Sequence, residues 1–401
     1  MSLSATERVR ASAAPLGVFA VMLSGMVVLP ALRPLLAARG AGEGAMHAFL
    51  SAGMFGAVLL VPLFGIVADR VVGRRSMAIA LLAVDAAAAL ACAAPAPLWV
   101  SFAARFVEGA ANVGALSMVM SLDPSPHGRG MAAKGTAMMA ALVVGSPLGG
   151  LLLGLGARAP FAAAAVALTL AVPLVAGAPD AARPSPRAPV TASPSLFVAC
   201  GLAFAERFSV GAFVVTFALR AHSVLGMSDR AVSMAYAAML VPFAAATYPV
   251  ARLANRLSRG TMVLIGSVTY AAAFAVIAIG GPAAAVAALA VAGVASALVY
   301  APALCYAATA SSEGARGTRM ALFHAAGCLG MALGPAFAGI LGASLRRAAI
   351  ADGPRHAAVL LVAGLAPLTA AALLRRHLAT PRAAEGPPDA STETTQPVRT
   401  R

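Results

Sequence analysis

The chain has 401 residues, of which 61% are apolar and 11% are charged, and its formal net charge is +15. So much apolar sequence excludes a single soluble domain and is typical of a protein that crosses a membrane many times. In a soluble protein the positive charge would suggest nucleic acid, but here the arginines fall in short loops and at the termini. The sequence therefore predicts an all-α integral membrane protein that contacts anionic lipid and binds no nucleic acid.

Apolar runs of suitable length divide the chain into two sets, because crossing a bilayer core takes about 20 residues. The first six membrane helices are expected at 13–37, 45–67, 76–94, 97–120, 132–156 and 159–177. The second six are expected at 195–219, 230–251, 261–280, 283–309, 319–343 and 356–374. The division predicts an N-terminal bundle over 1–177, a proline-rich linker over 178–194, a C-terminal bundle over 195–375 and a disordered tail over 376–401.

Arginine and lysine also predict the orientation. If the N-terminus is inside, the segments on the inner side carry most of the positive charge. This distribution predicts a bacterial-type inner membrane protein whose two termini, linker and tail all lie on the cytoplasmic side. The first apolar run is too long for a signal-peptide core and is expected to remain as the first span. The four cysteines lie within apolar runs without CxxC spacing, so we expect no metal site and no cofactor.

The polar hinge between the second and third runs reads GIVADRVVGRR, from Gly65 to Arg75. It resembles the loop between the second and third membrane helices of the major facilitator superfamily, written G-x-L-A-D-R-x-G-R-R. This chain has one extra residue, Val72, before Gly73. The resemblance implies a fold of twelve membrane helices in two pseudo-symmetric bundles.

The resemblance also implies that this loop is a gate. In the family's pattern, Asp69 would cap the N-terminal end of the eleventh helix while Arg74 pairs with Asp123. A carboxylate near a helix N-terminus stabilises it by about 0.3 to 1 kcal/mol, so these contacts would hold one side closed. The gating residues implied are Gly65, Asp69, Arg70, Gly73, Arg74 and Asp123.

Two sequence echoes indicate an internal duplication. ARLANRLSRG at 251–260 echoes the hinge, and GPAFAG at 334–339 echoes GSPLGG at 145–150, at nearly the same offset. GSPLGG also resembles the family's antiporter motif, which ends G-P-x-x-G-G, and this implies export. The residues expected in close helix packing are Gly145, Pro147, Gly149, Gly150, Gly334 and Pro335.

The fourth run contains RFVEGAAN, which resembles a second facilitator motif, R-F-x-Q-G-x-G-A, with Glu108 in the Gln position. Arg105, Glu108 and Asn112 fall at i, i+3 and i+7, so they share one helical face. The resemblance implies a role for Arg105 in proton transfer. The alternative is an ion pair between Arg105 and Glu108 that only fixes packing.

Glu206 in the seventh run is the first candidate for proton coupling, ahead of Glu108 and Asp85, because an acid inside the membrane is costly and usually functional. Its neighbour Arg207 is about 100° away around the helix, so we do not expect the two to pair. The alternative is that both lie near the cytoplasmic end and reach to the interface.

Aromatic and histidine side chains at helical spacing could line a pocket for substrate, although the same spacing also suits ordinary packing. The candidates are Phe213, Tyr236, Phe243, Tyr300 and His324.

The chain is identified as a member of the major facilitator superfamily, similar to its twelve-helix drug:proton antiporters. We expect a secondary active transporter, not an enzyme, that works as a monomer and exports a drug-like or amphipathic compound in exchange for protons. GxGxxG and GxxxxGK[ST] are absent, so ATP drive is not expected. The alternatives are a metabolite or sugar facilitator or importer without proton coupling, and a membrane receptor that does not transport.

Overall fold

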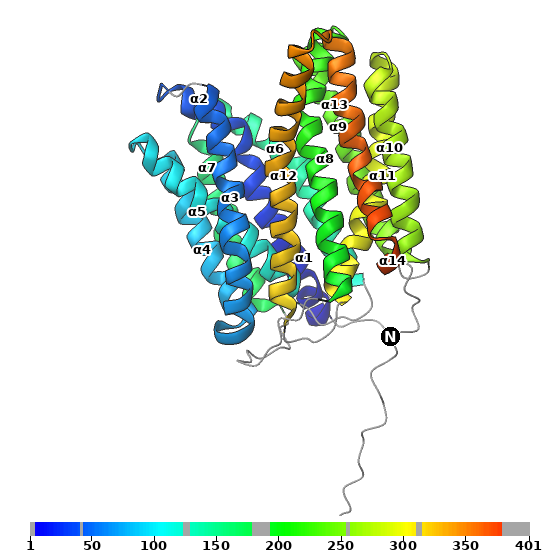
Figure 1. The fold of residues 1–401 in the computed structure, drawn as a ribbon. Helices are drawn as coiled ribbons and strands as arrows, with labels where there is room; N and C mark the ends of the chain where they lie inside the picture. The colour runs from blue at the N-terminus through cyan, green and yellow to red at the C-terminus, as the bar shows by residue number, and fades with distance from the viewer. Residues whose placement is uncertain are drawn as a thin grey trace, which may run out of the picture.

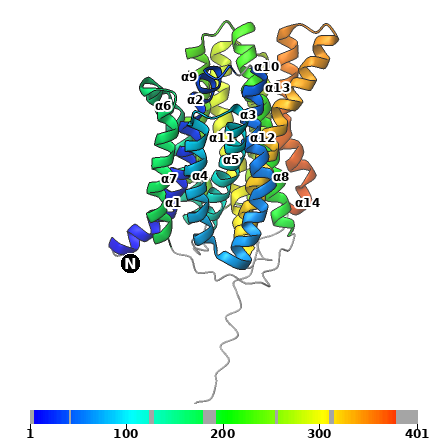
Figure 2. The same ribbon diagram turned by 90° about the vertical axis from the view of Figure 1, so that its left-hand side faces the viewer.

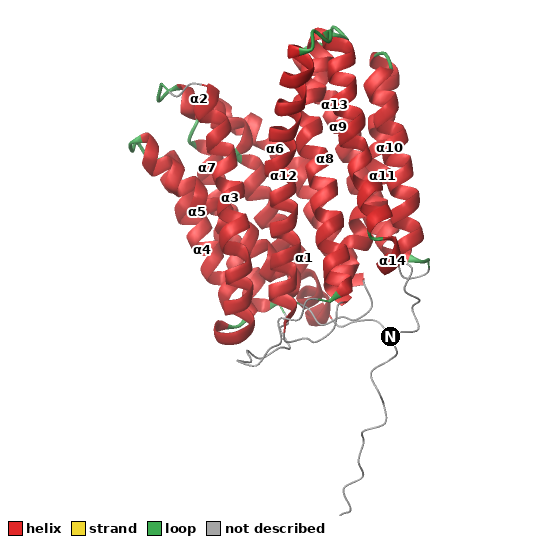
Figure 3. Cartoon of the chain, in the orientation of Figure 1, coloured by secondary structure: helices red, strands yellow, loops and turns green. Residues whose placement is uncertain are grey.

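The structure, a computed structural model, describes residues 5–40, 43–122, 129–178, 193–253, 257–309 and 315–378. All regular structure in these residues is helical (Figure 3). The N-terminal half consists of α1 (Ala5–Val27), α2 (Leu29–Ala37), α3 (Glu43–Val67), η1 (Ala68–Val72), α4 (Arg74–Ala93), α5 (Leu98–Ser121), α6 (Arg129–Leu152), η2 (Leu153–Leu155) and α7 (Ala159–Gly177). The C-terminal half consists of α8 (Pro194–Ser223), α9 (Asp229–Leu253), α10 (Arg259–Ile279), α11 (Pro282–Thr309), α12 (Arg316–Arg347), α13 (Asp352–Leu373) and α14 (Arg375–Leu378).

The helices cover the twelve predicted spans, with two differences. The first span is divided at Val28, where α2 begins with proline among its first residues. The predicted tail starts three residues too early, because α14 continues to Leu378. Residues 379–401 and most of the predicted linker lie outside the described residues.

Eleven helical segments of the described chain are long and apolar enough to cross a membrane, judged by length and composition. The twelfth, α5, is not among them, although it has 24 residues and packs against α3 and α4. It carries Arg105, Glu108 and Asn112 in buried positions. Figures 1 and 2 show α5 running alongside its neighbours, so it belongs to the same bundle.

The hydrophobic core is shared at one end of the molecule and divided at the other. We call the end that carries Asp69 the Asp69 end, and the other the opposite end. Near the Asp69 end a single cluster combines residues of both halves, including Leu116 and Met138 with Tyr300 and Phe323. The two other clusters each belong to one half alone. In Figure 1 the N-terminal helices accordingly lean away from the C-terminal helices toward the opposite end.

Glycines allow close helix contact at equivalent places in the two halves. A Cβ on Gly149 of α6 would lie 2.1 Å from the carbonyl oxygen of Val27, and one on Gly145 would lie 2.4 Å from Met26. In the C-terminal half, a Cβ on Gly334 of α12 would lie 2.3 Å from the carbonyl oxygen of Phe208 on α8. α6 thus packs on α1 as α12 packs on α8, in agreement with the echo between the two motifs.

The prediction of close helix packing is wrong for two residues. Pro147 and Gly150 are exposed, and a Cβ on Gly150 would have nothing within 4 Å. The reason is helical geometry, since Gly145 and Gly149 share one face and residues 147 and 150 lie on another. Pro335 is exposed as well, although its ring lies beside Gly211 of α8.

These contacts predict opposite effects for two adjacent substitutions. Gly149→Ala places a methyl group against a backbone carbonyl that cannot move aside, and overpacking of this kind costs about 1 to 3 kcal/mol. Gly150→Ala adds a methyl group in open space and removes glycine from a helix interior, which stabilises by up to about 1 kcal/mol. We expect the midpoint of thermal unfolding, followed by circular dichroism in detergent, to fall for Gly149→Ala and to hold or rise for Gly150→Ala. Equal midpoints for the two variants would contradict the packing described here.

Candidate functional site

The carboxylate of Asp69 joins the two halves. Its oxygens accept hydrogen bonds from the backbone N–H groups of Gly317 (3.2 Å) and Thr318 (2.7 Å) and from the Thr318 hydroxyl (2.8 Å). The Nε of Arg74 lies 2.8 Å from the same carboxylate. Because Gly317 and Thr318 form the first turn of α12, Asp69 caps that helix from the other half of the molecule.

The helix contact beside Asp69 is equally close. A Cβ on Gly65 would lie 2.7 Å from Ala321 and from the Cα of Thr318, so only glycine allows α3 and α12 to approach this far. Asp69 is 3% exposed. The acid is therefore removed from solvent only while the two halves are together at this end.

The extra residue in the hinge is absorbed by a wider helical turn. Residues Ala68–Val72 form a single π-type turn, in which the Gly73 N–H donates to the Ala68 carbonyl at 2.9 Å. Such a turn holds one more residue than an α-helical turn. Gly73 then ends it with φ of 91°, a conformation that favours glycine.

Of the other predicted gating residues, Arg70 is exposed. Arg74 pairs with Asp69, whereas the prediction paired it with Asp123, and Asp123 lies outside the described residues. The prediction put the Asp69 cap at the N-terminal end of this helix but did not name its donors, Gly317 and Thr318. Their signal is the start of the eleventh span, RGTR, where a hydroxyl residue stands among the first helical positions.

Elsewhere in the described part of the chain, hydrogen bonds also join helices α5 and α12 and helices α6 and α11 across the halves. The Ser117 hydroxyl of α5 lies 2.9 Å from Nδ1 of His324 on α12. The Tyr300 hydroxyl of α11 donates to the sulfur of Met138 on α6 at 3.4 Å. Both contacts belong to the part of the molecule where the core is shared.

Glu206 is buried in the C-terminal half, with 2% of its surface exposed. Its Oε1 accepts a hydrogen bond from the Ser296 hydroxyl at 3.3 Å, and its Oε2 lies 3.3 Å from Nε of Arg207. The expectation that Glu206 and Arg207 do not pair is therefore wrong. The long arginine side chain bends back around the helix and offsets the 100° between the two Cα positions.

The same arginine continues toward the interface. Its guanidinium carbon lies 5.7 Å from the centre of the Tyr300 ring, within range of a cation–π interaction. A chain of contacts thus runs from Glu206 through Arg207 and Tyr300 to Met138 of the other half.

The N-terminal half holds a second group of buried polar side chains. Arg105 and Glu108 form an ion pair on one face of α5. Further along α5, the side-chain amide of Asn112 donates to Asp85 of α4 at 2.8 Å and to the Ser24 hydroxyl at 3.1 Å. The sequence analysis missed Ser24 here and Ser296 beside Glu206, because a serine inside an apolar run gives no distinctive signal.

The predicted substrate residues fall into two separate groups. Phe213 is 1% exposed and packs with Tyr236, their ring centres 5.8 Å apart, in a core that belongs to the C-terminal half alone. Phe243, Tyr300 and His324 lie instead at the shared core, with the Phe243 and Tyr300 rings 5.9 Å apart. The structure therefore does not bring all five side chains together, and their role in substrate binding stays a prediction.

No group of three His, Cys, Asp or Glu side chains that could hold a metal ion occurs among the described residues. The polar groups found here can accept and release protons or bind an organic solute.

Comparison with known proteins decides the family. The model of the Major Facilitator Superfamily matches residues 16–221 and again residues 196–400. The chain belongs to the Major Facilitator Superfamily. It is therefore a multi-pass membrane protein and a transporter of a small molecule. No protein in a search of curated sequences matches it.

Solved structures of the superfamily share the fold. A crystal structure of the human organic anion transporter MFSD10 (TETRAN) is 19% identical with a TM-score of 0.74, and the match covers 92% of this chain and 99% of that one. The proton:xylose symporter XylE bound to 6-bromo-6-deoxy-D-glucose is 13% identical with a TM-score of 0.73, covering 92% and 95%. FucP in the outward conformation is 14% identical with a TM-score of 0.72, covering 92% and 98%.

The Asp69 contacts predict that loss of one charge loosens this end. Asp69→Asn keeps one acceptor oxygen but removes the charge that Arg74 and the α12 N-terminus stabilise, at a cost of about 1 to 3 kcal/mol. Spin labels at the exposed positions Val71 and Leu257, in a chain whose native cysteines are replaced by alanine, would report the separation of the halves. We expect a population with a longer distance to appear in Asp69→Asn.

Arg70→Gln is the matched control, because it removes a charge from the same loop but from an exposed side chain. It should leave the distance distribution unchanged. If both variants or neither produced the longer distance, the gating role of Asp69 would be lost.

Proposed function

We propose that the chain is a proton-coupled secondary transporter that exports a drug-like or amphipathic organic compound by alternating access.

Alternating access is supported by the divided core. The halves share one core near Asp69 and have separate cores at the opposite end. With the Asp69 end in the cytoplasm, as the arginine distribution indicates, this is a state closed to the inside. In the proposal, a bundle over 1–177 and a bundle over 195–375, joined by the linker at 178–194, rock as rigid bodies in a bacterial-type inner membrane, as a monomer with both termini inside.

Proton coupling is supported by one observation above all. Glu206 is buried and paired with Arg207, whose guanidinium group lies over Tyr300, and Tyr300 hydrogen-bonds Met138 across the interface. A proton on Glu206 would remove the negative charge that holds Arg207. The guanidinium group would then change its contact with Tyr300, so that a proton inside one half alters a contact between the halves.

In the proposal, substrate binds at the shared core. Phe243, Tyr300 and His324 supply aromatic faces there, and Nε2 of His324 makes no hydrogen bond within the described chain. Such a mixture suits an amphipathic compound. Export is supported by the resemblance of GSPLGG, at residues 145–150, to the antiporter motif. Within this stretch, Gly145 and Gly149 allow the close contact between α6 and α1.

A facilitator or importer without proton coupling is the alternative. It would use the same gate and the same rocking, and Arg105, Glu108, Asp85 and Glu206 would then serve only to join helices. The buried polar side chains of the N-terminal half favour a purely structural role for themselves, because Arg105 pairs with Glu108 on the same helix.

The test is proton movement in proteoliposomes with an imposed pH gradient. Lipophilic cations, neutral drugs and common metabolites are added in turn to the wild type, Glu206→Gln, Glu108→Gln and Asp85→Asn. We expect one compound class to provoke proton flux in the wild type, and we expect Glu206→Gln to abolish it, because the amide cannot carry the proton. Exchange of labelled substrate without a gradient should persist in Glu206→Gln, which shows that the variant is folded.

Substrate that crosses without any proton movement in the wild type would favour the facilitator. Loss of coupling in Glu108→Gln or Asp85→Asn, with Glu206→Gln unaffected, would move the coupling site to the N-terminal half.

A further inference from the structure

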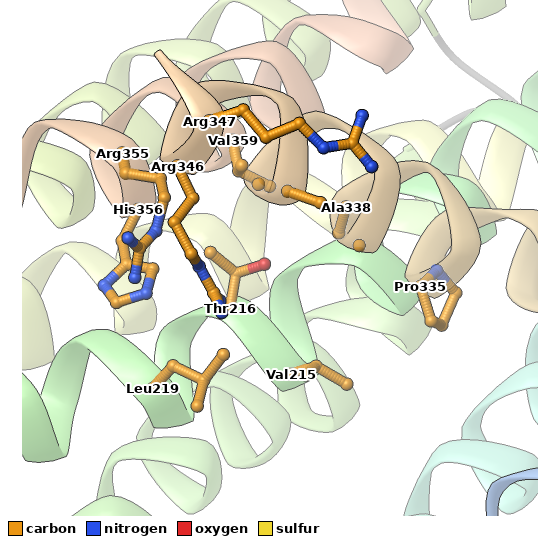
Figure 4. A pocket seen from close by; sticks show the side chains of 13 residues that line it. Val215, Thr216, Leu219, Pro335, Ala338, Arg346, Arg347, Arg355, His356 and Val359 are labelled. Atoms are coloured by element: carbon orange, nitrogen blue, oxygen red, sulfur yellow. The ribbon is translucent and has the colours of Figure 1, made fainter. Parts of the chain in front are cut away.

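A pocket of about 320 Å³ lies between α8, α12 and α13 at the opposite end of the molecule. Most of its lining is apolar or small, but Arg346, Arg347, Arg355 and His356 also line it. Figure 4 shows Arg346, Arg355 and His356 together on one side of the pocket, with Thr216 of α8 facing them. It is made entirely by the C-terminal half and shares no residue with the Asp69 gate or the Glu206 pair.

The pocket has an excess of positive charge. None of its lining residues is acidic. Asp352 forms an ion pair with Arg355 at 2.6 Å, but its own side chain is 56% exposed. Asp352 thus offsets the charge of Arg355, while Arg346 and Arg347 also line the pocket, and gathered like charges favour the binding of an anion.

His356 is the second indication of a ligand. It is 6% exposed, and its Nδ1 makes no hydrogen bond within the described chain. Buried polar atoms are nearly always hydrogen-bonded, so an unpartnered ring nitrogen in the lining of a pocket indicates a missing partner. A ring N–H at that position can donate to an anion.

Helix ends explain only part of this arrangement. Arg346 and Arg347 occupy the last turn of α12, where the helix dipole favours cations. Arg355 and His356 are close to the start of α13, where the dipole disfavours them. Their burial at the unfavourable end needs a different reason.

The turn between α12 and α13 places Arg346, Arg355 and His356 on the same side of the pocket (Figure 4). Ala349 has φ of 57°, and the Ile350 N–H donates to the Leu345 carbonyl at 3.1 Å, which closes the end of α12. The last turn of α12 and the first of α13 are thereby fixed side by side.

We propose that this pocket binds a phosphate-bearing anion. Guanidinium groups match phosphate oxygens with two parallel hydrogen bonds, and those of Arg346 and Arg355 lie beside the His356 imidazole on one side of the pocket (Figure 4). The apolar lining, which includes Val215, Leu219 and Val359, accommodates the carbon part next to the phosphate. The head group of an anionic phospholipid and a soluble organic phosphate both have this chemistry.

The first arm of the test measures soluble anion. The full-length protein in neutral detergent is heated in increasing sodium phosphate, with sodium chloride at matched ionic strength as reference. We expect phosphate to raise the midpoint of unfolding of the wild type, and we expect Arg346→Gln to need about tenfold more phosphate for the same rise. Arg158→Gln is the matched control, since Arg158 is an exposed arginine before α7 in the other half, and it should behave as the wild type.

The second arm measures lipid. Native mass spectrometry compares retention of phosphatidylglycerol and phosphatidylcholine by the same three proteins. Selective loss of phosphatidylglycerol from Arg346→Gln assigns the site to a lipid head group, and a selective loss of the phosphate response assigns it to a soluble anion. If Arg346→Gln and Arg158→Gln are indistinguishable in both arms, or if chloride reproduces the phosphate effect and lipid retention does not differ, the proposal is overturned. Neither arm depends on transport.

Discussion

The burial of Asp69 is the constraint on which the closed end depends. A buried carboxylate is stable only when its oxygens have donors, and three of its donors belong to Gly317 and Thr318 in the other half. Separation of the halves at this end must therefore return Asp69 to water. Arg74, five residues away at the start of α4 in the same half, pairs with Asp69 and would stay beside it if the halves parted. The loop can therefore lose the helix cap without leaving an isolated charge, which keeps the difference between the two states small.

The glycines divide the molecule into stiff and separable parts. Within each half, helix backbones touch at several glycines, such as Gly56 against Phe106 and Gly293 against Met239, where a Cβ would lie 2.1 Å from a carbonyl oxygen. Among the described glycines, only Gly65 and Gly317 would place a Cβ within 3.0 Å of the other half, and both are at the Asp69 end. Packing of this kind favours movement of the halves as units about a contact that can part.

Sequence reasoning predicted the features that depend on the length of an apolar run. It failed for features that depend on the conformation of a single side chain. The spans and the cap by Asp69 were predictable, because about 20 apolar residues must cross the bilayer and the hinge motif was recognisable. Helical periodicity can group residues on one face of a helix, but it cannot say which helix covers that face. For this reason the sequence did not show that Phe213 and Tyr300 lie in different cores. The pair of Glu206 and Arg207 was missed because Cα directions were used for a side chain long enough to bend back.

The two halves use their buried charges differently, although they are related by duplication. In the N-terminal half, the ion pair lies within α5, and Asn112 holds Asp85 inside the same half. In the C-terminal half, Arg207 contacts both Glu206 and the Tyr300 ring, and the Tyr300 hydroxyl hydrogen-bonds Met138 of the other half. A change of charge on Arg105, Glu108 or Asp85 would alter contacts only within the N-terminal half. A change at Glu206 would alter a contact between the halves. In the proposed mechanism the C-terminal acid is therefore the one whose protonation biases the equilibrium between two arrangements of the halves.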